Sequence, residues 1–157
     1  MLRRRTVRVT AVVLVAAFVL AACGGGDSKE AAKALASKPT VTVPDGPPPT
    51  KLAVKDLVVG KGAEAKAGQN VTVQYVGVAY SDKKQFDASW DTGQPFPFRL
   101  GGGNVIKGWD QGVPGMHVGG RRQLIIPPDL AYGPEGYPPV IKPNETLIFV
   151  IDLVSVS

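Results

Sequence analysis

Residues 104–112, with the sequence NVIKGWDQG, lie between a run of three glycines and a proline. Asn104 is a favourable N-cap residue for a short helix. The apolar residues of this stretch and of the position that follows it fall on one helical face: Val105, Ile106, Trp109 and Val113. The flanking sequence on both sides reads as strands separated by turns, so this helix is expected to lie against a curved sheet. Periodicity alone places Trp109 in the core, and the alternative is that it forms the floor of an apolar pocket.

Alternating apolar residues predict the strands around this helix. Val71, Val73 and Tyr75 recur with a period of two and are expected to share one face of a strand. Further strands are predicted at residues 51–59, 85–90, 95–98, 121–126 and 146–156, with a long loop at 129–144. The predicted fold class is therefore α+β, an antiparallel sheet with one helix. Six residues are assigned to its core: Phe98, Leu100, Leu124, Ile126, Leu147 and Ile151.

The charge distribution argues against nucleic-acid binding. The formal net charge is +5, but four of the arginines lie among the first eight residues. Removal of the leader at residues 1–22 lowers the net charge to +1, which is not the pattern of a polyanion-binding protein.

The chain has a single cysteine, Cys23, and a single histidine, His117. An intramolecular disulfide and a cysteine-rich metal site are thereby excluded, and no metal or cofactor is predicted. No nucleophile-elbow pattern accompanies His117, which is expected in an exposed turn.

The N-terminal residues predict export. A basic segment at 1–8 precedes an apolar run at 9–20, which is shorter than the roughly 20 residues that span a bilayer. The following Leu20-Ala21-Ala22-Cys23 resembles the lipobox of bacterial lipoproteins. That resemblance implies a signal peptide at 1–22, a lipid on Cys23 and a location at the bacterial cell membrane, on its extracytoplasmic side. An ordinary secretory signal and an uncleaved anchor are the alternatives, and the sequence leaves open which membrane is involved.

Residues 23–49 are predicted to be a tether between the anchor and the domain. They are rich in glycine, alanine, lysine and proline, a composition expected to bury no core. As a coil, this tether has a reach of roughly 25–30 Å, comparable to the diameter of a small domain.

Several short motifs occur in order within residues 50–157. They are VQYVG at 73–77, FDAS at 86–89, PFPF at 95–98, VIKGW at 105–109, AYG at 131–133 and PNETLIF at 143–149. Together they closely resemble the FKBP-type peptidyl-prolyl cis-trans isomerases. The resemblance implies a twisted antiparallel sheet, a half-barrel, wrapped around one short helix. It also implies an isomerase that needs no cofactor and acts on proline-containing polypeptides.

The same resemblance implies the site. Trp109 would be the pocket floor, and the Ile106 backbone N–H and the Tyr132 hydroxyl would donate to ligand carbonyls. The implied catalytic residues are Asp87, Tyr132 and Trp109. The implied substrate-binding residues are Tyr75, Phe86, Phe96, Val105, Ile106, Val140, Ile141 and Phe149.

The chain departs from the family pattern in three places. Thr92 stands where many members have a basic residue able to pair with Asp87. Trp90 replaces a residue that is often polar or basic. Pro134, Tyr137 and Pro139 alter the loop over the pocket, which puts sequence preference and macrolide affinity in doubt.

The leading hypothesis is a monomeric, membrane-tethered prolyl isomerase that assists the folding of exported proteins, with macrolides as candidate inhibitors. The second is a binding module or holdase chaperone that has kept the fold and lost efficient catalysis. A solute-binding lipoprotein is disfavoured by size, because such receptors usually need two lobes.

Overall fold

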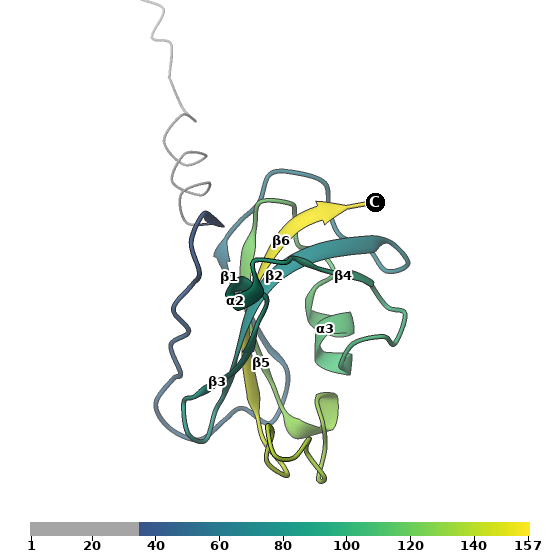
Figure 1. The fold of residues 1–157 in the computed structure, drawn as a ribbon. Coiled ribbons are helices and arrows are strands. Elements are labelled where there is room, and N and C mark those ends of the chain that lie inside the picture. The colour runs from purple at the N-terminus through teal and green to yellow at the C-terminus, as the bar shows by residue number, and fades with distance from the viewer. Residues whose placement is uncertain (1–34) are drawn as a thin grey trace, which may run out of the picture.

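The computed structural model describes residues 35–157. A six-stranded antiparallel sheet forms most of this fold (Figure 1). The sheet curves around a short helix, which confirms the predicted α+β class. In chain order the elements are β1 (Ala53–Val58), β2 (Asn70–Ala79), β3 (Gln85–Ala88), α2 (Ser89–Thr92), β4 (Phe96–Arg99), α3 (Lys107–Gly112), β5 (Arg121–Ile126), the 3₁₀ turn η1 (Pro128–Leu130) and β6 (Leu147–Val156).

Strand β2 is divided between two partners along one of its edges. The strand order is β1-β5-β6-β2-β3, and β4 also pairs with β2. Strand β4 pairs with the first part of β2, from Asn70 to Val73, and β3 pairs with the last part, from Val76 to Val78. Along this edge neither strand pairs with Gln74 or Tyr75, so the sheet has a gap there.

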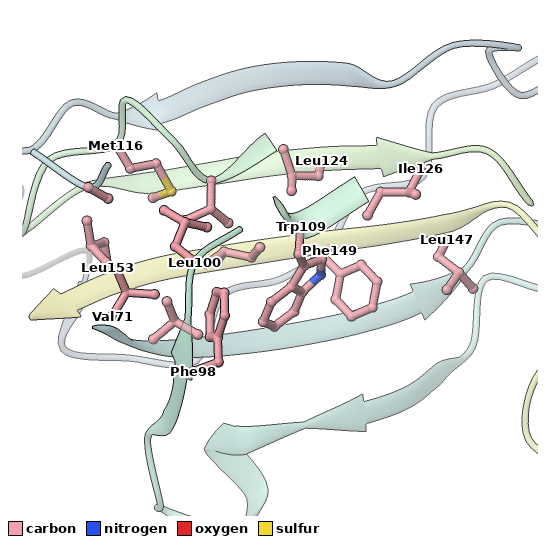
Figure 2. Close-up of a cluster of buried hydrophobic side chains, with 14 of the residues drawn as sticks. Val71, Phe98, Leu100, Trp109, Met116, Leu124, Ile126, Leu147, Phe149 and Leu153 are labelled. Atoms are coloured by element: carbon pink, nitrogen blue, oxygen red, sulfur yellow. The ribbon is translucent and has the colours of Figure 1, made fainter. Parts of the chain in front are cut away.

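The main core lies between α3 and the sheet (Figure 2). Val71 and Val73 are buried on this face, and Tyr75 packs against the same cluster, as their alternation predicts. The core prediction is confirmed, since all six assigned residues are at most 7% exposed: Phe98, Leu100, Leu124, Ile126, Leu147 and Ile151.

Two glycines bring α3 close to β5. A Cβ atom at Gly108 would lie 2.4 Å from Ile126 Cγ2, and one at Gly112 would lie 2.7 Å from the Leu124 methyl carbons. A Cβ atom at these distances would force the Ile126 and Leu124 side chains to move, so glycine lets the helix backbone rest on these side chains. The close contact places Trp109 deep in the core, at 4% exposure.

The start of α3 differs from the prediction. Asn104 is not the N-cap residue, because the helix begins at Lys107 after Ile106, and no side chain caps it. The preceding loop is organised from inside the helix by Asp110 instead. Its two carboxylate oxygens accept hydrogen bonds from the backbone N–H groups of Gly101 and Gly103, at 2.8 and 3.0 Å. These bonds fold the glycine run back onto the helix and fix where the helix starts.

Residues 37–46 also differ from expectation. The sequence places them in a free tether, but in the structure they lie against the face of the sheet opposite α3 (Figure 1). Val41 and Val43 pack there against Val76 and Val78 of β2. The predicted signal peptide and Cys23 lie outside the described residues. None of the helices within residues 35–157 has the length and hydropathy needed to cross a membrane.

His117 is less exposed than predicted. It is half-buried, and its Nδ1 lies 2.9 Å from the carbonyl oxygen of Gly62. Residues Glu64 and His117 form an isolated β-bridge, which holds the turn before β5 in place.

We expect Gly108→Ala to destabilise the protein by about 1–3 kcal/mol, because the added methyl group overpacks the contact with Ile126. Alanine is the better helix former by about 1 kcal/mol, so the packing cost must exceed that gain. Urea unfolding measures the difference. Gln111→Ala, at an exposed position of the same helix, is the control and should change stability by less than about 0.5 kcal/mol. A stabilised Gly108→Ala variant would contradict the close contact.

Candidate functional site

A pocket of about 280 Å³ opens where α3, the sheet and the loop after η1 meet. Strands β2, β3, β4 and β6 contribute side chains to it, as do the residues before α3. Its lining is largely aromatic and aliphatic: Tyr75, Phe86, Asp87, Phe96, Asn104, Val105, Ile106, Trp109, Tyr132 and Phe149.

Trp109 is held in this pocket by edge-to-face packing. Its ring centroid lies 5.1 Å from that of Tyr75 and 5.2 Å from that of Phe149, with interplanar angles of 78° and 89°. The ring centroid of Phe98 lies 5.5 Å from that of Trp109. Figure 2 shows Trp109 with Phe98 and Phe149. Its indole N–H is buried without a partner among the described residues. Aromatic packing of this geometry is favourable, so the rings alone fix the orientation of the indole.

The gap along β2 places Tyr75 in the pocket. The Tyr75 backbone N–H has no strand partner on that side, and the hydroxyl of Ser89 accepts its hydrogen bond at 2.8 Å. The same hydroxyl donates to the side-chain oxygen of Gln74. Ser89 is 6% exposed, so a buried side chain satisfies the backbone group that the sheet leaves unpaired. The interruption lets β3 and β4 diverge on either side of Tyr75 and provides the pocket with two walls.

Gly77 makes room for the wall nearest β3. A Cβ atom there would lie 2.7 Å from Phe86 and 2.8 Å from Phe149. Without that atom, the two rings meet edge to face with their centroids 5.5 Å apart. A glycine in the middle of β2 is therefore required by the packing of the pocket aromatics.

Asp87 is the charged side chain of the pocket, and Tyr75 holds it. The Tyr75 hydroxyl donates to Asp87 Oδ2 at 2.6 Å. Burial, and then this hydrogen bond and the Asp87 charge, raise the pKa of Tyr75 well above its usual range. Burial also raises the pKa of Tyr132, with a smaller contribution from the Asp87 charge. Both hydroxyls therefore keep their protons at neutral pH and remain hydrogen-bond donors.

The pocket brings together nearly all the residues that the sequence predicted for it. Val140 and Ile141 are the exceptions. Val140 is 50% exposed on the outer loop, and Ile141 is buried at 4% in the main core. Asn104 was missed, because its place before the helix suggested a cap and not a pocket wall. The Thr92 hydroxyl donates to the Ser89 carbonyl at 3.0 Å.

The chemistry available here is binding and orientation. Within residues 35–157 no three His, Cys, Asp or Glu side chains lie close enough together to hold a metal ion. The pocket offers aromatic faces, one carboxylate, two protonated tyrosine hydroxyls and the backbone at the start of α3. This arrangement suits a small apolar ring flanked by carbonyl groups.

Comparison with known proteins agrees with this architecture. The model of the family "FKBP-type peptidyl-prolyl cis-trans isomerase" matches residues 61–154. A protein of Streptomyces anulatus named "FK506-binding protein" is 60% identical over 120 residues, which cover 76% of this chain and 97% of that protein. Since 120 residues exceed the length of the segment 50–157, this similarity extends upstream of Thr50. A "Probable FK506-binding protein" of Corynebacterium glutamicum is 52% identical over 118 residues, covering 75% of this chain and 98% of its own.

A solved structure has the same fold. The protein described as "Crystal structure of AtFKBP13" superposes with a TM-score of 0.63 and is 44% identical, covering 68% of this chain and 93% of its own. The chain therefore belongs to the FKBP-type peptidyl-prolyl cis-trans isomerase family.

Tyr75→Phe should lower stability at neutral pH by about 1 kcal/mol, because the Asp87 carboxylate loses its donor. The native state holds the Tyr75 proton more tightly than the unfolded state does, since the native pKa is raised above 10.0. This contribution is complete below pH 10 and is lost as the pH rises toward the native pKa. Urea unfolding at about pH 8 and about pH 11 checks this. Between these two pH values the free energy of unfolding should fall less for Tyr75→Phe than for the wild type.

The control for this experiment is Tyr137→Phe, at a residue that is 63% exposed. It should keep wild-type stability at neutral pH. Equal stability of the wild type and Tyr75→Phe at neutral pH would show that the hydroxyl contributes nothing to the folded state.

Proposed function

We propose that the chain accelerates cis-trans isomerisation of prolyl bonds in exported polypeptides, as a monomer and without covalent chemistry. The packed aromatic pocket over Trp109 is the observation that carries this proposal. Its volume of about 280 Å³ accommodates a proline ring and parts of its neighbours. Membership of the isomerase family supports the reaction, and the residues of the pocket supply a physical route to it.

The barrier to be lowered comes from amide resonance. Rotation about a prolyl amide takes tens to hundreds of seconds because the C–N bond has partial double-bond character. The planar amide is more polar than the twisted transition state, so transfer from water into an aromatic pocket favours twisting. Shortening this time to milliseconds is about a 10⁴-fold acceleration and requires roughly 5.5 kcal/mol of differential stabilisation.

Two donors would hold the peptide while it twists. One is the hydroxyl of Tyr132, a pocket residue that is 40% exposed. The backbone N–H of Ile106 lies at the residue before α3, where helix geometry leaves the first N–H groups without helical partners. Each would bind a carbonyl on one side of the proline and so hold the ring over Trp109.

Asp87 would contribute a fixed negative charge. Tyr75 orients one of its carboxylate oxygens, and the carboxylate remains on the wall formed by β3. There it would face the carbonyl carbon of the amide that rotates. Twisting ends the donation of the nitrogen lone pair to this carbon, so its positive charge increases. The Asp87 carboxylate would therefore favour the twisted geometry. An orienting charge that costs no reorganisation is an effective means of stabilising a transition state.

The test is a cis-trans exchange assay on a proline-containing peptide with the full chain carrying Cys23→Ser. We expect Tyr132→Phe to lower kcat/KM about five- to tenfold, as expected for one lost hydrogen bond. Asp87→Ala should lower it at least as much. Glu64→Ala removes an exposed carboxylate remote from the pocket and should leave the rate unchanged.

An inactive wild-type chain at high protein concentration would refute catalysis. If that chain still suppressed aggregation of unfolded proteins, the fold would be serving as a binding module or holdase. The pocket also suits macrolides of the FK506 class, after which several of the related proteins are named. Competition between such a macrolide and the proline peptide would support a shared pocket.

We further propose that Cys23 carries a lipid anchor and that the domain works at the extracytoplasmic side of the bacterial membrane. The lipobox-like Leu20-Ala21-Ala22-Cys23 supports this, although it lies outside the described residues. Metabolic labelling with a fatty acid should mark the wild type in bacterial cells and leave Cys23→Ser unlabelled. Ala21→Ser, which keeps a small residue before the cysteine, is the control and should remain labelled. Equal labelling of wild type and Cys23→Ser would exclude the anchor.

A further inference from the structure

Residues 37–46, which we call the strap, form an extended segment with two distinct sides. Pro39, Val41 and Val43 are half-buried, whereas Thr40 and Thr42 between them are exposed. This period of two is that of an extended chain with one face against a surface. The strap belongs to no strand of the sheet, so contacts other than strand pairing hold it in place.

The inward side of the strap completes a second apolar cluster. Val41 and Val43 pack, together with Trp90, against Val76, Val78 and Ala88, which are 3%, 5% and 6% exposed. Trp90 was an unexplained departure from the family pattern in the sequence. Its ring is half-buried, and its indole N–H has no partner among the described residues. Trp90 therefore packs against the same buried cluster as the strap valines.

Hydrogen bonds hold both ends of the strap. At one end, Arg121 donates to the Ser37 carbonyl at 3.0 Å, and the same guanidinium binds both carboxylate oxygens of buried Asp152 at 2.5 and 2.7 Å. At the other end, the Tyr80 hydroxyl lies within donating distance of the Pro44 and Gly46 carbonyls, at 3.1 and 3.2 Å. The strap therefore spans the sheet between two fixed points.

The strap is also connected to the pocket wall. The Lys38 ammonium group pairs with Asp91 of α2, and the other carboxylate oxygen of Asp91 accepts a hydrogen bond from Gln85 of β3 at 2.7 Å. The bond from Lys38, and then that from Gln85, lower the pKa of Asp91. The carboxylate therefore stays ionised at neutral pH and keeps both partners.

Strand β3 needs such support, because it is short and lies at the edge of the sheet. It has four residues, its only strand partner within residues 35–157 is β2, and its register with β2 shifts between Gly77 and Val78. Edge strands with few ladder bonds open more readily than central ones. Phe86 and Asp87 are on this strand, so its position sets the geometry of one pocket wall.

We propose that the strap is a positioning element for the isomerase site, which holds β3 and α2 so that Phe86 and Asp87 face the pocket. This inference rests on the proposed function, since it takes these two residues as part of the active pocket. It also moves the start of the folded unit from the predicted Thr50 to about Ser37. The strap acts through β3 and is not itself in contact with the substrate.

The test compares two double variants of the full chain that introduce the same charges. Val41→Asp with Val43→Asp places them against the apolar cluster, and Thr40→Asp with Thr42→Asp places them in solvent. Amide hydrogen exchange is measured in β3 and in the central strand β6, and kcat/KM is measured well below the melting temperature of each variant.

We expect the valine variant to exchange Phe86 and Asp87 amides at least tenfold faster, with β6 unchanged. Its kcat/KM should fall about tenfold, because small displacements of catalytic groups are costly. The threonine variant should match the wild type in both measurements. If the valine variant does not fold, Val41→Thr with Val43→Thr removes the apolar contact at nearly constant volume, with the same expectation.

The proposal would be overturned if the strap amides exchanged faster in the valine variant while exchange in β3 and kcat/KM stayed unchanged. The strap would then only cover the sheet. That result, in an active wild-type chain, would leave the proposed function intact. If the wild-type chain had no isomerase activity, the proposed function would fail, and the exchange rates in β3 would still decide whether the strap positions that wall.

Discussion

The direct contact between α3 and β5 is the constraint on which the rest of the structure depends. Because Gly108 and Gly112 carry no side chains, the helix backbone rests on Ile126 and Leu124. At this separation, Trp109 spans the remaining space and meets the aromatic rings of β2 and β6. The residues before the helix then reach the pocket rim. A helix held farther from the sheet would bring neither the indole floor nor the start of its own backbone to the same cavity.

The pocket exists because the sheet is incomplete along β2. A continuous partner strand would satisfy the Tyr75 N–H and close the space into which its ring projects. Instead, β3 ends at Ala88, the chain turns through α2 and returns as β4, and Ser89 supplies the missing acceptor. The loss of strand pairing is thus offset by one buried side-chain hydrogen bond. Binding geometry and sheet geometry are set by the same few residues.

Most of the fold could be predicted from the sequence, because strand alternation is a local signal. The pocket residues were predicted only from the resemblance of the ordered motifs to the family, since periodicity alone places them in the core. The places where the structure differs from the sequence-based expectation have physical causes. The start of α3 is set by Asp110 and the glycine loop, a contact that N-cap preference does not include. Ile141 matches a flanking loop position by motif, yet its burial depends on how the proline-rich loop folds over the core. The Thr-Val-Thr-Val alternation at residues 40–43 was a readable strand-like signal, but the surrounding glycine and proline obscured it.

The direction of the strap determines where the chain enters the folded body. Residues 44–46 lie beside Tyr80, at the end of the sheet where Ser81, Asp82 and the loop at 142–145 meet. Ser37 lies by Arg121, toward the opposite end of the strands and on the far face from α3. The chain therefore joins the folded body on the face of the sheet opposite α3. For the proposed anchor at Cys23, the docked strap shortens the predicted tether, because residues 37–46 no longer contribute to its reach.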